Sequence, residues 1–97
     1  MIKVGDIVIC IKDHLYENKN YNTYSYTTNH GYIIKAVEEF AYYIEADTKN
    51  EAGIKIENSW GIRFSTIKED MNIKKFGDYF ITLAEYREQQ MKIILDE

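Results

Sequence analysis

Apolar residues with β-branched side chains dominate the start of the chain, in the run IKVGDIVICI from Ile2 to Ile11. Valine and isoleucine favour extended backbone, and a run with little polar alternation is typical of a strand buried on both faces. Two further β-rich runs, YIIKAV and FAYYIEA, are separated only by Glu38 and Glu39. This arrangement predicts a β-hairpin over residues 32–46.

Alternation is clearest between Ile54 and Phe64. Ile54, Ile56, Asn58, Trp60, Ile62 and Phe64 share one parity, and Lys55, Glu57, Ser59, Gly61 and Arg63 share the other. A period of two predicts a strand with one face toward the core and one toward water. Trp60 is therefore expected in the core, with a groove-lining position as the alternative. A turn at Asn58-Ser59 would divide the run into two strands of a further hairpin.

A polar segment rich in tyrosine, HLYENKNYNTYSYTTNHG, lies between the first two apolar regions. Tyr24 and Tyr26 alternate with Thr and Ser, which predicts an edge strand or hairpin arm. A polar loop has no core reason to carry four aromatic residues, so we expect Tyr16, Tyr21, Tyr24 and Tyr26 to form a partner-binding surface. The alternative is that the nine tyrosines of the chain reflect strand propensity, and Tyr32, Tyr42 and Tyr43 are assigned to that explanation.

The C-terminal sequence, YFITLAEYREQQMKIILDE, predicts an amphipathic helix over about residues 82–96, with Thr82 as its N-cap and Glu85 completing a capping box. Tyr86 and Ile93 widen its apolar face to roughly 200°, although a helix packed on one sheet needs only about 100°. We interpret the surplus as an oligomer or ligand interface that includes Tyr86, Arg87, Gln90 and Ile93, or as cover for a sheet edge of the same chain. The first interpretation implies a homodimer through the C-terminal helix.

Together these elements predict a mainly β fold in a single domain over residues 1–97, with strands over about 2–64 and one C-terminal helix. The expected architecture is a small SH3-like antiparallel barrel or strongly bent sheet. An open antiparallel sheet with the helix across one face is the alternative. Residues 65–78 are expected to hold a short helical turn.

Composition narrows the function classes. The net charge of −4 comes from sixteen acidic residues scattered among twelve basic ones, which argues against nucleic-acid binding. No apolar run is long enough to span a membrane, and the first residues do not resemble a signal peptide. The single cysteine, Cys10, fits a buried, reduced thiol in the cytoplasm.

Candidate catalytic chemistry is sparse. Cys10, His14 and His30 are nominal nucleophile, base or metal ligands, but extended backbone separates the side chains of Cys10 and His14 by about 13 Å. Asp13-His14 is expected to be a solvated turn pair. Phosphate-binding loops, serine elbows and paired carboxylates are not evident. We therefore expect a non-enzymatic protein without metal or cofactor.

The two ends of the chain, KVGDIVICIK and FITLAEYREQQMKIILDE, resemble the small accessory proteins of tailed bacteriophages, which begin with a Lys-Val-Gly-Asp strand and end with a Phe-x-x-Leu-x-Glu-Tyr-Arg-Glu helix. The resemblance covers roughly a third of the chain and implies a small SH3-like barrel between the ends. The segment from Tyr16 to His30 is longer and more aromatic than the resemblance implies. The resemblance supplies no catalytic residues, and it implies that the protein acts in the cytoplasm of a host cell.

Two functions follow as hypotheses. The first is a protein-binding module that docks on a host or phage protein, such as an inhibitor of a host defence or transcription component. The second is an oligomeric binder that sequesters a small anionic ligand such as a nucleotide, with aromatic residues stacking on the base and Arg63 or Arg87 holding phosphate.

Overall fold

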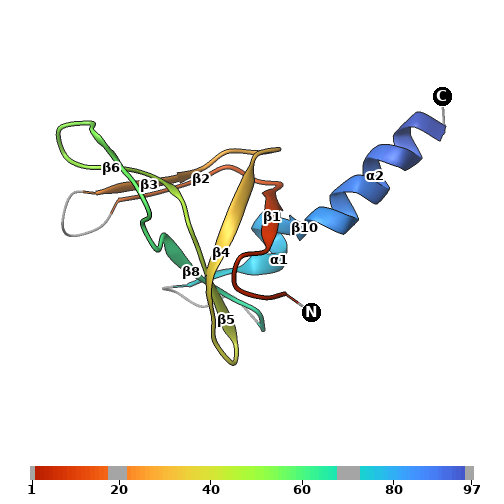
Figure 1. Cartoon of the computed structure of the whole chain (residues 1–97), viewed down its shortest axis with the longest axis horizontal. Coiled ribbons are helices and arrows are strands. Elements are labelled where there is room, and N and C mark those ends of the chain that lie inside the picture. The colour runs from red at the N-terminus through yellow and green to blue at the C-terminus, as the bar shows by residue number, and fades with distance from the viewer. Residues whose placement is uncertain (1, 18–21, 68–72, 96–97) are drawn as a thin grey trace.

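Ten short strands and two helices make up the part of the chain that this computed structural model describes, residues 2–17, 22–67 and 73–95 (Figure 1). The strands are β1 (Ile7–Cys10), β2 (His14–Glu17), β3 (Thr23–Tyr26), β4 (Gly31–Val37), β5 (Ala41–Ile44), β6 (Asp47–Lys49), β7 (Lys55–Ile56), β8 (Ile62–Ser65), β9 (Lys74–Lys75) and β10 (Phe80–Thr82). The helices are α1 (Phe76–Tyr79) and α2 (Leu83–Leu95). The fold is therefore mainly β with a C-terminal helix, as predicted.

The strands form two sheets, and the chain crosses between them. Six strands pair in the order β10-β1-β4-β5-β8-β9, and four pair in the order β2-β3-β6-β7. Neighbouring strands are antiparallel except for β8 and β9, which are parallel. The chain passes from the first sheet to the second between β1 and β2 and again between β5 and β6, so the two sheets curl around a common core (Figure 1). The prediction of a strongly bent sheet is confirmed.

Aromatic rings fill the core between the sheets. Phe64 lies edge-on to Phe80, with ring centroids 5.1 Å apart, and Tyr26 lies edge-on to both. Edge-to-face pairs of this kind contribute about 0.5–1.5 kcal/mol each beyond the burial of their area. Cys10 is fully buried in this core, as predicted. Ile7 and Ile11 are exposed, however, so the predicted run from Ile2 to Ile11 is buried on both faces only at residues 8–10.

The predicted hairpin over residues 32–46 is confirmed by the pairing of β4 with β5. The backbone N–H of Glu38 donates to the carbonyl oxygen of Ala41 and closes the turn. The register of this pair shifts between Ile34 and Ala36. The predicted helical turn is found in α1, and residues 68–72 of that segment lie outside the described residues.

The predicted strand from Ile54 to Phe64 is interrupted. Asn58 and Gly61 have φ angles of 57° and 72°, in the left-handed region. Each of these residues turns the chain, so β7 pairs with β6 and β8 pairs with β5. The two halves therefore belong to different sheets and do not form the further hairpin that the turn at Asn58-Ser59 suggested.

Helix α2 begins at the predicted cap. The hydroxyl of Thr82 accepts the backbone N–H of Glu85 at 3.1 Å, which makes Thr82 the N-cap, and the same hydroxyl donates to the Glu85 carboxylate at 3.1 Å. The helix packs mainly against β1 and β10 at its N-terminal end and then points away from both sheets (Figure 1). It does not lie across a sheet face, so the alternative architecture is wrong. Among the described residues, no helix is long and apolar enough to span a membrane.

Candidate functional site

Trp60 lies on the surface, not in the core, with 59% of its area exposed. Its ring packs edge-on against Tyr43, with centroids 5.8 Å apart. Tyr43 is paired with Arg63 across β5 and β8, between inward-facing pairs that include the buried Phe64 and Ile44. Tyr43 and Arg63 therefore face away from the core. We call Tyr43, Trp60, Arg63 and the neighbouring Glu38 the Trp60 surface.

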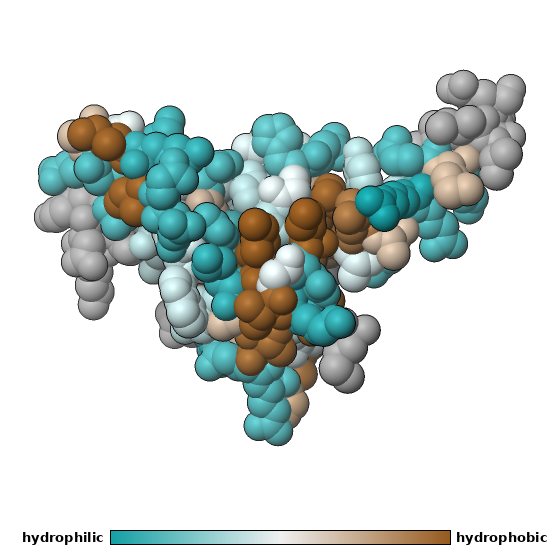
Figure 2. Space-filling model, in the orientation of Figure 1, coloured by the Kyte–Doolittle hydropathy of each residue, from teal (hydrophilic) through white to brown (hydrophobic). Residues whose placement is uncertain are grey.

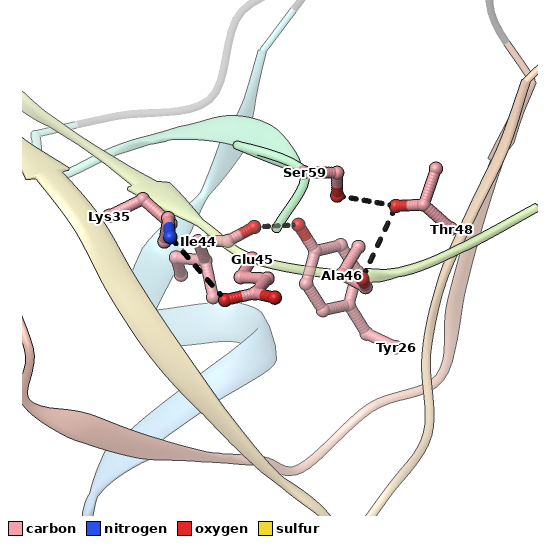
Figure 3. Close-up of polar contacts among 7 residues, drawn as sticks. All are labelled: Tyr26, Lys35, Ile44, Glu45, Ala46, Thr48 and Ser59. Atoms are coloured by element: carbon pink, nitrogen blue, oxygen red, sulfur yellow. Dashed lines mark hydrogen bonds and ion pairs between the residues drawn. The ribbon is translucent and has the colours of Figure 1, made fainter. Parts of the chain in front are cut away.

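The backbone before Trp60 is fixed by a buried hydroxyl. The hydroxyl oxygens of Ser59 and Thr48 are 2.6 Å apart, and that of Thr48 also donates to the carbonyl oxygen of Ala46 at 3.2 Å (Figure 3). Thr48 is almost completely buried on β6. A buried hydroxyl is costly to leave without a partner, so these bonds tie Ser59 to the four-stranded sheet.

The backbone after Trp60 is fixed by a tyrosine from β3. The hydroxyl of Tyr26 donates to the carbonyl oxygen of Ile44 (Figure 3). It also accepts the backbone N–H of Ile62 at 3.0 Å. Burial raises the pKa of the Tyr26 hydroxyl, so it keeps its proton and its role as a donor.

Gly61 allows the backbone after Trp60 to lie close to Ile44 and to the hydroxyl of Tyr26. A Cβ atom at Gly61 would lie 1.7 Å from the carbonyl oxygen of Ile44 and 2.8 Å from the hydroxyl of Tyr26. Only a residue without a side chain fits here, and glycine also tolerates the φ angle of 72°. Trp60 is therefore held between two fixed neighbours while its ring faces solvent.

Ion pairs border the aromatic centre of the Trp60 surface. The Nε atom of Arg63 donates to a carboxylate oxygen of Glu38 at 2.6 Å. The Nζ atom of Lys35, on β4, lies 3.7 Å from a carboxylate oxygen of Glu45, the residue that follows β5 (Figure 3). Partly exposed pairs add about 0–1 kcal/mol to stability, so their main effect is to fix the side chains. An apolar centre inside a polar rim is the usual anatomy of a protein interface.

The predicted tyrosine surface is only partly formed. Tyr16 and Tyr24 meet across β2 and β3, with ring centroids 6.2 Å apart. Tyr16 is 45% exposed, whereas Tyr24 is half-buried against the core. Tyr21 lies outside the described residues. The assignment of Tyr26 to this surface is wrong, because its side chain is 2% exposed and both of its hydroxyl contacts are internal.

The prediction that His14 belongs to a solvated turn is also wrong. Its ring packs against Tyr79 at 5.0 Å and Phe64 at 6.0 Å, and it stacks on Tyr26 at 6.4 Å. Burial, and then the positive charges of Lys74 and Lys12, hold the pKa of His14 below its ordinary value of 6.5. Neutral His14 is therefore part of the core packing.

The Cys10 thiol and the Asp13 carboxylate each form hydrogen bonds within the chain. The Cys10 thiol donates to the carbonyl oxygen of Lys12 at 3.0 Å, and burial raises its pKa, which is the opposite of what a nucleophile needs. The Asp13 carboxylate accepts the N–H and the hydroxyl of Thr28, which lower its pKa. Within residues 2–17, 22–67 and 73–95, no cluster of three or more His, Cys, Asp or Glu could hold a metal ion.

The predicted interface residues divide between two places. Arg63 belongs to the Trp60 surface. Tyr86 is half-buried on α2, while Arg87 and Gln90 are exposed there. Ile93 lies in α2 beyond Lys92, the last residue of the helix whose side chain is described.

The alternation in the sequence placed Trp60 in the core, and no pattern marked Tyr43 as a surface residue. The signal that could have corrected this is Asn58 and Gly61, two residue types that tolerate left-handed backbone, on either side of Ser59-Trp60. Comparisons with protein-family models, with curated proteins and with solved structures find no match to this chain.

Proposed function

We propose that this protein is a non-enzymatic protein-binding module that contacts its partner through the Trp60 surface. The observation that carries the proposal is the exposed indole of Trp60 on a backbone held from both sides. Tryptophan, tyrosine and arginine are the residues that most often dominate binding energy at protein interfaces, and all three converge here. A fixed backbone reduces the ordering entropy lost when a partner binds.

The charges around Trp60 favour a protein partner over a small anion. Arg63, predicted to hold phosphate, donates to Glu38, and Lys35 is close to Glu45. Each of these cations is matched by a carboxylate. Small-molecule sites are usually concave, whereas the Trp60 surface lies on the outer face of a sheet. These features favour protein binding over nucleotide sequestration, the second function inferred from the sequence.

The class of partner comes from the resemblance of the chain's ends to phage accessory proteins. This resemblance favours a partner among the proteins of a bacterial host. The target that the module inhibits is then a component of host defence or transcription. Inhibition would follow from occupation of the surface that the target needs for its own contacts.

Capture of partners from bacterial lysate by the tagged protein tests this proposal. Trp60→Ala is expected to weaken binding of the captured protein by about 30-fold, the equivalent of about 2 kcal/mol at an interface hot spot. Ile54→Ser is the matched control, because Ile54 is 63% exposed but lies in the turn between β6 and β7, outside the Trp60 surface. The control is expected to bind as the unmodified protein does.

Tyr16→Ala separates this surface from the tyrosine pair on β2 and β3. If Tyr16→Ala abolishes capture while Trp60→Ala leaves it unchanged, the contact surface is the tyrosine pair and the proposal is wrong. The melting temperature of each variant shows whether a loss of binding reflects a loss of folding.

A further inference from the structure

A track of exposed residues, Ala84, Arg87 and Met91, runs along one side of α2 from an apolar groove at the start of the helix. At the N-terminal end of the helix, a groove with a volume of about 590 Å³ is lined in part by Ile2, Ile7, Leu83 and Ala84. Figure 2 shows apolar residues gathered at the centre of this face and continuing toward the start of α2. Met91 lies two turns beyond Ala84, on the same side of the helix, and is 62% exposed.

Beyond its N-terminal end, α2 packs against few of the residues that the structure describes. It contains 13 residues and spans about 20 Å, yet its main contacts are with β1 and β10. Isolated helices shorter than about 12–15 residues are marginal in water, and most helices in proteins are stabilised by packing of an apolar side. A second surface along the track would supply that packing.

The charged residues of α2 indicate which kind of surface packs along the track. Ala84, Arg87 and Met91 follow at spacings of three and four along the track, and Glu85, Glu88 and Lys92 follow at the same spacings along its edge. The acidic residues lie toward the start of the helix and the lysine toward its end. If a second α2 lies antiparallel in the track, the same edges face each other. Lys92 of each chain then faces Glu85 and Glu88 of the other.

We propose that this protein is a homodimer in which two α2 helices pack antiparallel, related by a twofold axis. Each helix lies in the track of the other chain, and its C-terminal end reaches the groove beside Ala84. Met91 of one chain packs near the alkyl stem of Arg87 of the other. The contact is self-complementary, as a twofold interface requires. It rests on α2 and is independent of the Trp60 surface.

Sedimentation of the full chain over a range of concentrations tests the dimer. The unmodified protein is expected to dimerise, and its melting temperature is expected to rise with concentration because the dimer stabilises the fold by mass action. Met91→Lys places a charge in the track and is expected to raise the dissociation constant at least about tenfold. Gln89→Glu, on the side of the helix away from the track, is the control and is expected to leave dimerisation unchanged.

Charge reversal tests the orientation. Lys92→Glu alone, and Glu85→Lys combined with Glu88→Lys, each place like charges across the antiparallel contact and are expected to weaken self-association. Mixing these two variants restores opposite charges and is expected to restore a dimer that contains one chain of each. Recovery on mixing also shows that both variants fold. A protein that stays monomeric at all concentrations, a dimer insensitive to Met91→Lys, or failure of the mixture to associate would overturn the proposal.

Discussion

Two residues remote from Trp60 in the sequence, Tyr26 and Thr48, fix the backbone on either side of it. Tyr26 holds Ile62 and Ile44 together through one hydroxyl, and Thr48 holds Ser59. These contacts join the two sheets next to Trp60, where the side chains change from buried to exposed. Buried hydrogen bonds therefore hold Trp60 in its exposed position. These bonds are costly to break, because each would leave a buried polar group without a partner.

Gly61→Ala is expected to destabilise the protein strongly. The left-handed backbone costs a residue with a Cβ atom about 1–2 kcal/mol, and the contact of 1.7 Å with the Ile44 carbonyl oxygen adds a displacement of β5 or β8. Gly53→Ala is the matched control, because Gly53 also has a positive φ, of 81°, but no atom lies within 4 Å of the position of its Cβ. Urea unfolding measures both variants, and equal losses of unfolding free energy would contradict the steric role of Gly61.

At the scale of elements, β2 and α1 are joined through the ring of His14. The strand carries His14 against Tyr79 of α1 and against Phe64 of β8, so one side chain links three elements. The alternation in β2 and β3 brings Tyr26 into the same cluster, because His14 and Tyr26 are directly opposite in register. Protonation of His14 would place a charge among these rings and beside two lysines.

Stability is therefore expected to depend on pH through His14. Its pKa is 6.5 in the unfolded chain and lower in the folded protein, so the unfolded chain binds more protons between the two values. The free energy of unfolding falls as the pH falls through 6.5 and stops falling once the pH is below the folded pKa. Urea unfolding between about pH 7.5 and pH 5.5 measures this loss.

His14→Gln should flatten this pH dependence, because glutamine does not titrate. His30→Gln is the control, since His30 is exposed and touches none of the rings around His14 among the described contacts. An undiminished pH dependence in His14→Gln would show that other groups cause it.

Local patterns predicted the elements whose contacts are close in the sequence. The cap at Thr82 depends on Glu85, three residues away, and the hairpin of β4 and β5 depends on residues that adjoin its turn. The positions of Trp60 and Tyr26 could not be predicted in this way. Tyr26 is fixed by Ile62, thirty-six residues farther along the chain, and two left-handed residues break the alternation that placed Trp60 inside. Tertiary contacts override the local pattern at both positions.

At the scale of the whole molecule, the bent sheets present the Trp60 surface on their outer side, and α2 extends away at one end, giving a longest dimension of 46 Å (Figure 1). The Trp60 surface and the track on α2 share no residue. A dimer through α2 would therefore carry two copies of the Trp60 surface. Two linked surfaces would bind a multivalent partner more tightly than one, without any new contact.

Acrylamide quenching of tryptophan fluorescence tests the central claim most directly, because Trp60 is the only tryptophan in the chain. In the free protein, Trp60 is expected to be quenched almost as readily as a tryptophan in a short peptide. After addition of the captured partner, quenching is expected to fall several-fold as the indole is buried. A tryptophan that is protected in the free protein, or equally accessible in the free protein and in the complex, would contradict the account.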